Sequence, residues 1–140
     1  MLPETTAFRI LDNNAELNVL MDTLRGKKID EEGSFEQGIF TYSIPDNFKK
    51  EEAAPFIRIN PIDEDPVIFM DDDNIAEQQT IQIDFWCKNA SDSAALKKEI
   101  DQIMKENNHI QYDSDRYKDP DIDLVMNVRK YRVFDFKKIN

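Results

Sequence analysis

The sequence is poor in the residues on which small enzymes and metal proteins depend. Its 140 residues include one cysteine, Cys87, one histidine, His109, and only three glycines. A single cysteine excludes an intramolecular disulfide and is typical of a reducing compartment, and one cysteine with one histidine is too few for a structural zinc site. Gly26, Gly33 and Gly38 lie too far apart for a glycine-rich loop that cradles phosphate. We therefore expect neither a cofactor nor a metal.

Long apolar runs are also missing. No stretch approaches the roughly 18 consecutive apolar residues that a transmembrane helix needs. The first residues, Met1 to Thr6, do not begin a basic segment that leads into an apolar core. The sequence therefore predicts a cytoplasmic protein with no signal peptide, no membrane span and no membrane partner.

Negative charge, by contrast, is abundant. The chain carries 29 acidic and 18 basic side chains, for a formal net charge of -11. Nonspecific nucleic-acid binding depends on Lys and Arg that replace counterions, so this excess of acids argues against it. Only two short runs, Arg25–Lys28 and Arg129–Arg132, supply local positive charge, and we interpret both as solvated ends of secondary-structure elements. Apolar residues make up 40% of the chain, which is enough to form one core.

Two segments have the apolar spacing of amphipathic helices. The first covers about residues 5–24, where apolar residues recur three to six positions apart. Asp12–Asn14 interrupts this segment, so one kinked helix and two shorter helices both fit, and Gly26 lies where a helix would stop. The second helix covers about residues 91–107 and follows a turn and N-cap at Asn89–Asp92. Each helix would turn one apolar face towards a core.

Other segments alternate apolar and polar residues, as strands do. The alternation is clearest between Gln79 and Cys87. In the last strand it shifts phase near Lys130, which predicts a bulge. An acidic turn is expected at 113–121. The predicted strands cover residues 38–44, 55–61, 79–87, a short piece at 109–112, and 122–136.

The order of these elements predicts an α+β fold. Helix, strands, helix and strands follow one another without recurring βαβ units. We expect a mixed, mainly antiparallel sheet with two main helices, at about 5–24 and 91–107, packed on one face. One domain would cover residues 1–140, with a flexible acidic arm at about 62–77 that forms a long loop or a hairpin.

The acidic clusters do not match a known metal-binding loop. An EF-hand loop requires Gly at its sixth position and Glu at its twelfth. Counted from Asp63, those positions hold Ile68 and Asn74, and the count from Asp119 fails in the same way. These acids are therefore interpreted as solvated loop residues.

No nucleophile stands beside a base in the sequence. The candidate acids inside predicted strands are Asp84 and Asp123, and a small hydrolase that uses one of them is the least favoured hypothesis. Both carboxylates are expected to face solvent on the polar side of their strands. Cys87 falls on the apolar face of its strand, where a buried thiol is usual, and His109 follows a helix end. We therefore expect no enzyme activity.

One passage, together with the order of the elements, resembles a known family. The strands Phe40–Pro45, Pro55–Ile59 and Ile81–Trp86, followed by the helix from Ser91, resemble the small tail-terminator or tail-completion proteins of long-tailed phages and prophages of Gram-positive bacteria. The similarity covers most of the chain. Its most specific part is an apolar-x-apolar-Asp-aromatic-Trp strand that leads into the helix.

This resemblance implies a structural protein of the virion without catalytic residues. Such a protein forms a ring, a hexamer, at the head-proximal end of the tail tube, stops tube polymerisation and joins the tail to the head. Its partners would be copies of itself, the tail-tube protein and the head-tail connector. DNA would pass through the ring without specific binding. Assembly would take place in the cytoplasm of the bacterial host, and the final location would be the phage tail.

Within that hypothesis, the acidic arm would line the lumen of the ring. Its carboxylates would repel the phosphates of passing DNA. Two aromatic residues are candidate interface anchors, although packing under a helix or loop is equally open for Trp86. The candidate lumen acids are Asp63, Glu64, Asp65, Asp71, Asp72 and Asp73, and the candidate anchors are Phe69 and Trp86.

A second hypothesis belongs to a different class. An acidic inhibitor or DNA mimic would present its carboxylates as a phosphate-like surface to a basic protein. Ring formation distinguishes the two hypotheses, because the mimic would act as a monomer or dimer.

Overall fold

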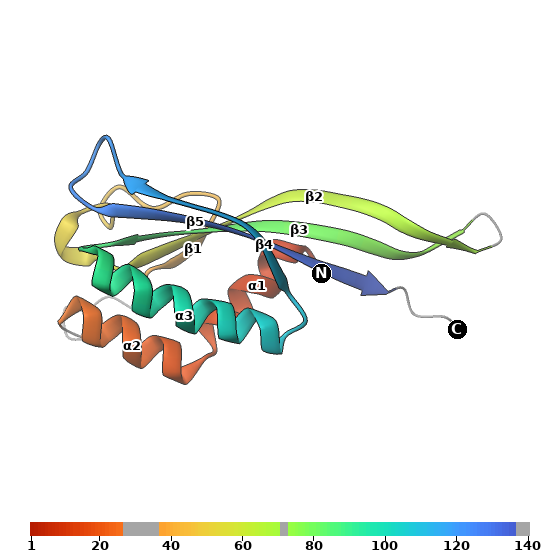
Figure 1. Cartoon of the computed structure of the whole chain (residues 1–140), viewed down its shortest axis with the longest axis horizontal. Helices are drawn as coiled ribbons and strands as arrows, with labels where there is room; N and C mark the ends of the chain where they lie inside the picture. Colours follow the sequence, from red (N-terminus) through yellow and green to blue (C-terminus); the bar gives the residue numbers. More distant parts are fainter. Residues whose placement is uncertain (27–36, 71–72, 137–140) are drawn as a thin grey trace.

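The computed structural model describes residues 1–26, 37–70 and 73–136, and it has the predicted α+β class (Figure 1). Its sheet is mixed and mainly antiparallel, with the strand order β1-β2-β3-β5-β4. Only β1 and β2 run parallel. In chain order the elements are α1 (Pro3–Asp12), α2 (Ala15–Arg25), β1 (Ile39–Thr41), the 3-10 turn η2 (Glu51–Ala53), β2 (Phe56–Met70), β3 (Asp73–Cys87), α3 (Ala90–Glu106), β4 (Ile110–Lys118) and β5 (Val125–Phe136).

The first predicted helix is two helices. The side chain of Asn14 accepts a hydrogen bond from the Leu17 N–H at 2.9 Å and caps α2, while Asn13 ends α1. Gly26 closes α2 with φ of 87°, a left-handed conformation that favours glycine. At α3 the side chain of Asn89 accepts from the Asp92 N–H at 2.8 Å, which confirms the predicted N-cap.

The helices and one face of the sheet share the larger hydrophobic cluster. The odd-numbered residues of β3, from Ile81 to Cys87, are fully buried in it, as the alternation in the sequence predicts. Ile57 and Ile59 of β2 extend the same face, and α2 and α3 lie beneath it in Figure 1. The helices contribute Ala7, Leu11, Leu17, Met21, Leu96, Ile100, Ile103 and Met104.

A second hydrophobic cluster covers the opposite face of the sheet near β1. Phe56 and Trp86 stack there, with ring centroids 5.2 Å apart, and Phe48 meets Phe56 edge-on at 6.2 Å. The segment that leads into β2 and the segment that leads into β5 close over these rings. The other buried members are Ala53, Ala54, Leu124 and Met126.

Arg25, at the end of α2, joins the two clusters. Its side chain is fully buried, and its guanidinium donates to the carbonyl oxygens of Ala53 at 3.0 Å and Pro55 at 2.7 Å. It also donates to the carbonyl and the side-chain oxygen of Gln37. Burial lowers the pKa of Arg25, and Asp22 opposes that effect. The guanidinium thus ties α2 to the segment beside the second cluster, and Arg25 is no solvated helix end.

The phase shift in β5 arises because the strand contributes to both clusters. Met126 packs into the second cluster, next to Leu124 from the segment before the strand, whereas Tyr131 lies in the first cluster, on the other face. The pairing of β5 with β3 runs without interruption, so β5 carries no bulge against β3. The bulge lies opposite Lys130, on β4, where Tyr112 is the extra residue.

The strand β4 is longer than the predicted piece at 109–112. It extends to Lys118 through residues for which an acidic turn was predicted, and that prediction was wrong. All but one of its residues are exposed, because β4 forms an edge of the sheet. Polar residues on both faces hide such a strand from the usual apolar alternation.

The acidic arm, residues 62–77, is part of a β-hairpin rather than a loop. It consists of the ends of β2 and β3 and extends past the helices in Figure 1. The Ile57 N–H donates to Gly38 on the outer side, so the nitrogen of Pro61 points outwards as well. After the bulge at Ile62, the Asp63 N–H donates to Thr80 inside the hairpin, which places the nitrogen of Pro66 on the outer edge too. Neither proline therefore costs the hairpin a hydrogen bond.

Candidate functional site

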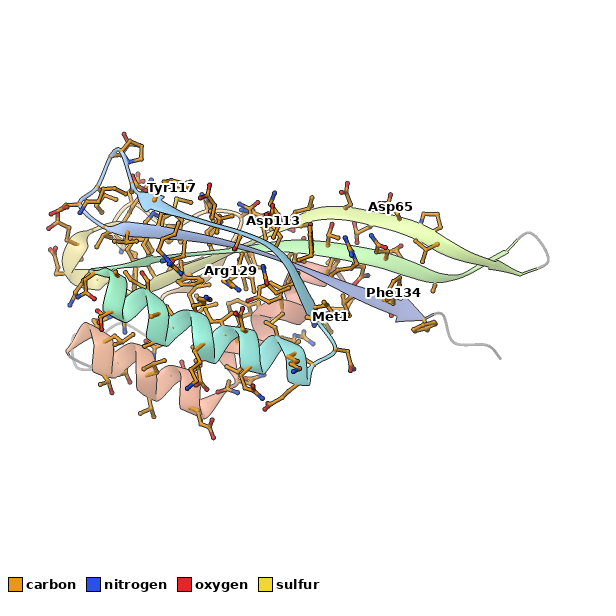
Figure 2. The ribbon with its side chains drawn as sticks, viewed as in Figure 1. Met1, Asp65, Asp113, Tyr117, Arg129 and Phe134 are labelled. Carbon is orange, nitrogen blue, oxygen red and sulfur yellow. The ribbon has the colours of Figure 1, made fainter. Side chains whose placement is uncertain are left out.

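The first candidate surface is the acidic arm. Asp63, Glu64 and Asp65 are exposed, and none of them forms an ion pair within the described parts of the chain. Figure 2 shows Asp65 on the arm, far from the helices. Of Phe69 and Asp73 only the strand position is described, near the end of β2 and the start of β3. The predictions for Asp71 and Asp72 lie outside the described residues.

Two phenylalanines at the end of β5 add apolar surface to the arm. Phe134 pairs with Gln78 and Phe136 with Ala76, and these two rings are 44% and 64% exposed. Both residues lie beyond the ends of the two clusters. An exposed aromatic pair beside carboxylates is typical of a protein-binding surface.

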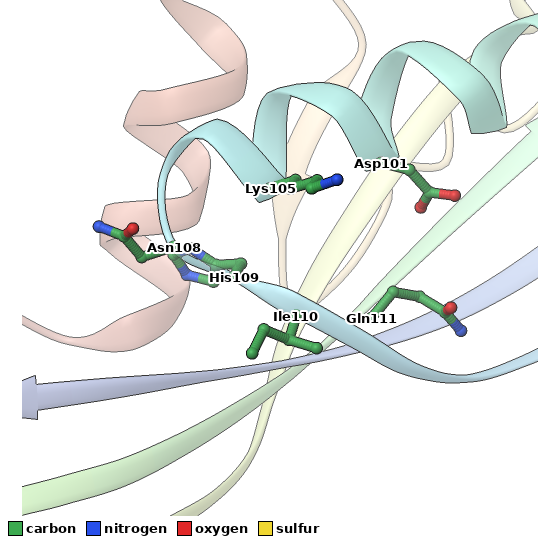
Figure 3. A pocket seen from close by; sticks show the side chains of 6 residues that line it. All are labelled: Asp101, Lys105, Asn108, His109, Ile110 and Gln111. Carbon is green, nitrogen blue, oxygen red and sulfur yellow. The ribbon is translucent and has the colours of Figure 1, made fainter.

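The second candidate surface is a groove between α3 and β4, which we call the α3–β4 groove. It consists of two adjoining hollows that share Asp101. The first has a volume of 440 Å³ and is lined by Asp101, Lys105, Asn108, His109, Ile110 and Gln111 (Figure 3). The second has a volume of 450 Å³ and is lined by Ala94, Lys97, Lys98, Asp101, Gln102 and Arg116.

The groove is basic although the chain is strongly acidic. Four of its lining residues are cations, namely Lys97, Lys98, Lys105 and Arg116. The three lysines form no ion pair with an acid in the portion of the chain that the structure describes. Its one carboxylate, Asp101, is already paired with a cation on β5. The groove therefore presents a local excess of positive charge.

The floor of the groove explains why Asp101 contributes little negative charge. The Arg129 guanidinium donates to the two carboxylate oxygens of Asp101 at 2.8 and 2.7 Å, a bidentate pair, and Tyr131 donates to the same carboxylate. Burial, and then the hydrogen bond to Asp101, raise the pKa of Tyr131, so the phenol keeps its proton. Burial opposes the charge of Arg129, but Asp101 more than compensates and raises its pKa. Arg129 is therefore not a solvated strand end.

A second buried polar group lies beside this one. Asn127 is 1% exposed and donates to Ser93 on α3 at 2.9 Å, while its side-chain oxygen accepts from Arg116 Nε at 2.6 Å. The residues of β5 that the sequence suggests are solvent-facing are thus sandwiched against α3. Their hydrogen bonds hold β4, β5 and α3 in one arrangement.

Asp84 does not face solvent, contrary to the sequence prediction. Its carboxylate is fully buried and accepts from Arg58 Nη2 at 2.6 Å and from Gln82 Nε2 at 2.9 Å. Both partners are side chains of the sheet, so Asp84 forms a buried ion pair that holds β2 and β3 together. Asp123, by contrast, is exposed as predicted and pairs with Lys118, but it lies before β5 rather than inside a strand.

Trp86 is buried rather than available as an interface anchor. It is 2% exposed, stacks on Phe56, and its indole N–H donates to Asp119 at 2.8 Å. Although burial of Asp119 acts in the opposite direction, hydrogen bonds from Trp86 and from the backbone lower its pKa. Of the two alternatives for Trp86, the structure of the single chain therefore shows packing under a loop.

Cys87 and His109 lie at opposite ends of α3. Cys87 contacts Ser93 in the first turns of the helix, whereas His109 follows its last residue, Glu106. At 1.5 Å per residue, the ends of this 17-residue helix are about 24 Å apart, so the two side chains form no catalytic pair. Burial raises the pKa of the Cys87 thiol to about 12, which keeps it protonated.

The described residues contain no group of three or more His, Cys, Asp or Glu side chains that could hold a metal ion. Within the same ranges, no helix is both long enough and apolar enough to cross a bilayer. Comparison of the sequence with known proteins gives no assignment: no family model matches the chain, and a search of curated proteins finds no match.

Proposed function

We propose that this protein is a structural assembly protein of a phage tail, which forms a ring at the head-proximal end of the tail tube, stops polymerisation of the tube and joins tail to head. The observation that supports this proposal most directly is the arm. Its acids Asp63, Glu64 and Asp65 are exposed, two exposed phenylalanine rings of β5 lie beside it, and none of its described residues belongs to either hydrophobic cluster. Such an element adds nothing to the core of a single chain. It does provide surface for contact with neighbouring subunits.

The two free edges of the sheet add support. Pro61 and Pro66 interrupt the outer edge of β2 and protect it from uncontrolled strand pairing. The opposite edge, β4, contains no proline and is exposed along its length. A protein with one protected edge and one open edge is suited to ordered contacts rather than to random aggregation.

Deletion of the gene from the phage or prophage that carries it tests this function. The expected result is tails of abnormal length that are not joined to heads, seen by negative-stain electron microscopy, and rescue by the gene supplied in trans. Normal virions after deletion would contradict the proposal. So would a gene neighbourhood without tail-tube and connector genes.

An acidic inhibitor or DNA mimic remains the second candidate, and the three exposed acids of the arm, Asp63, Glu64 and Asp65, favour it. A mimic would bind a basic protein with 1:1 stoichiometry, and DNA would compete for the same partner. Pull-down of a nucleic-acid-binding protein from the host, with release by DNA, would support this candidate over the ring.

A further inference from the structure

We infer that the acidic arm of one copy of this chain docks into the α3–β4 groove of a second copy. This inference rests on the proposed ring and identifies the contact that would build it. The two surfaces are opposite in charge. Asp63 and Asp65 have no cationic partner in the described residues, and neither do Lys97 and Lys98.

The partner must come from another copy. The arm extends away from the helices, while the groove lies between α3 and β4 in the body of the molecule (Figures 1 and 3). A hairpin anchored in a five-stranded sheet cannot fold back across that distance. Because the arm and the groove are different surfaces, their contact is heterologous, and such contacts form a closed ring when the rotation between copies permits it.

The pairing pattern of the strands shows which arm residues act together. Asp63 pairs with Thr80 and Asp65 with Gln78, and these rows continue to Arg132 and Phe134 of β5. Residues in one row share a face of the sheet, so Asp63, Asp65 and Phe134 lie on the same side. This face therefore offers acids next to an exposed ring.

The groove has a matching charge. Its hollow along the middle of α3 carries Lys97, Lys98 and Arg116. The arm carboxylates would meet these cations. The nearby acids Asp113 and Asp115 alternate with Arg116 on β4 and so lie on the face away from α3.

Side-chain charge, not strand addition, must form this contact. The outer edge of β2 lacks N–H donors at Pro61 and Pro66, so it is poorly suited to pair in register with the open edge of β4. The contact is therefore expected to weaken with salt, because ions screen exposed charge pairs.

Charge reversal on the two surfaces tests the inference. The variant Asp63→Lys with Asp65→Lys changes the net charge from -11 to -7 and reduces the general repulsion between copies. If general repulsion governed association, this variant would associate more tightly than the wild type. Docking of the arm predicts the opposite, a dissociation constant raised roughly tenfold in sedimentation velocity at low salt. The control, Asp12→Lys with Glu16→Lys, makes the same change in charge on exposed residues outside the arm.

The groove variant Lys97→Glu with Lys98→Glu should lose self-association in the same way, and Lys49→Glu with Lys50→Glu is its control. An equimolar mixture of the arm variant and the groove variant should associate again, because each arm then meets a groove of opposite charge. Failure of the mixture to associate would overturn the inference. So would wild-type affinity in either variant, or a wild-type chain that stays monomeric at low salt up to millimolar concentration.

Disulfide trapping gives a second readout that does not depend on affinity. A chain with Asp65→Cys mixed with a chain with Lys98→Cys should form a heterodimer under mild oxidation, and Glu16→Cys mixed with Lys98→Cys should not. The native Cys87 is fully buried and does not compete. Absence of the trapped heterodimer would overturn the inference.

These outcomes separate the contact from the proposed function. Rings that persist in both charge variants would exclude docking of the arm while leaving the tail function intact. Loss of retention of duplex DNA by Lys97→Glu with Lys98→Glu, with self-association unchanged, would assign the groove to nucleic acid and would also exclude docking.

Discussion

Asp84 and Arg58 face each other on adjacent strands, with Arg58 Nη2 2.6 Å from Asp84 Oδ2, but the two side chains differ in burial. The Asp84 side chain is fully buried, whereas that of Arg58 is 29% exposed and lies 5.1 Å from the centre of the Trp86 ring. Loss of Arg58 therefore leaves the buried Asp84 carboxylate without a cationic partner. Loss of the Asp84 charge leaves a cation that can reach water.

This asymmetry predicts unequal effects of two substitutions. Arg58→Met should lower the free energy of unfolding by about 3 kcal/mol, because Asp84 keeps only its bond to Gln82. Asp84→Asn should cost only about 1 kcal/mol, since its side-chain oxygen still accepts from Arg58. Urea unfolding of both variants measures the difference. Equal costs would show that the pair contributes as an ordinary surface ion pair.

Gly38 and Gly26 provide a matched pair for backbone strain. Both have positive φ, 97° and 87°, but a Cβ at Gly38 would lie 3.0 Å from Phe48 Cε1 and 3.2 Å from Arg25 Nη2, while a Cβ at Gly26 meets nothing within 4 Å. Gly38→Ala should cost about 3 kcal/mol, from strain and crowding together. Gly26→Ala should cost about 1 kcal/mol from strain alone. In thermal unfolding, the Tm of Gly38→Ala should therefore be well below the Tm of Gly26→Ala.

His109 should make stability depend on pH. It is 4% exposed, its Nδ1 donates to the Asn107 carbonyl at 2.8 Å, and burial lowers its pKa. The folded state therefore binds this proton less readily than the unfolded state, so the contribution of His109 to stability is present above the unfolded pKa and is lost as the pH falls. Between about pH 7.5 and pH 5, His109→Gln should lose less stability than the wild type. Urea unfolding of the wild type and of His109→Gln at both pH values tests this difference. An equal loss of stability in the two proteins would contradict the prediction.

Removal of the arm should leave the body folded. Replacement of residues 65–78 with Asn-Gly would join Glu64 to Gln79, which pair in the hairpin, through a two-residue turn. Because no described residue between 62 and 77 is a member of either cluster, the free energy of unfolding should change by only about 1 kcal/mol. Circular dichroism and thermal unfolding measure this change. Loss of the folded signal would show that the arm is part of the core.

The elements with regular apolar spacing could be predicted from the sequence. The alternation of Ile81, Ile83 and Phe85 and the spacing of Leu96 and Ile100 each follow one period, and both elements bury the predicted face. Asn14 and Gly26 likewise mark the ends of α2 through local hydrogen bonding and backbone conformation. Local rules are sufficient where one face of an element meets one core.

The polar residues of the sheet could not be assigned in this way. Asp84, Asn127 and Arg129 look like solvent-facing residues because a period-two pattern treats any polar side chain as exposed. Each is buried because a partner from a distant part of the chain satisfies it: Arg58 for Asp84, Ser93 for Asn127 and Asp101 for Arg129. The α3–β4 groove was missed for the same reason, since its cations come from two separate elements.

Arg25 has a consequence for how the molecule unfolds. Its stem belongs to α2, whose apolar face forms part of the first cluster, while its guanidinium holds the Ala53 and Pro55 carbonyls beside the second. If either cluster opened alone, a buried cation or several carbonyl oxygens would be left without partners, at a cost of several kcal/mol. The two faces of the sheet are therefore coupled, and the body should melt as one cooperative unit with no half-folded intermediate to be cut by proteases.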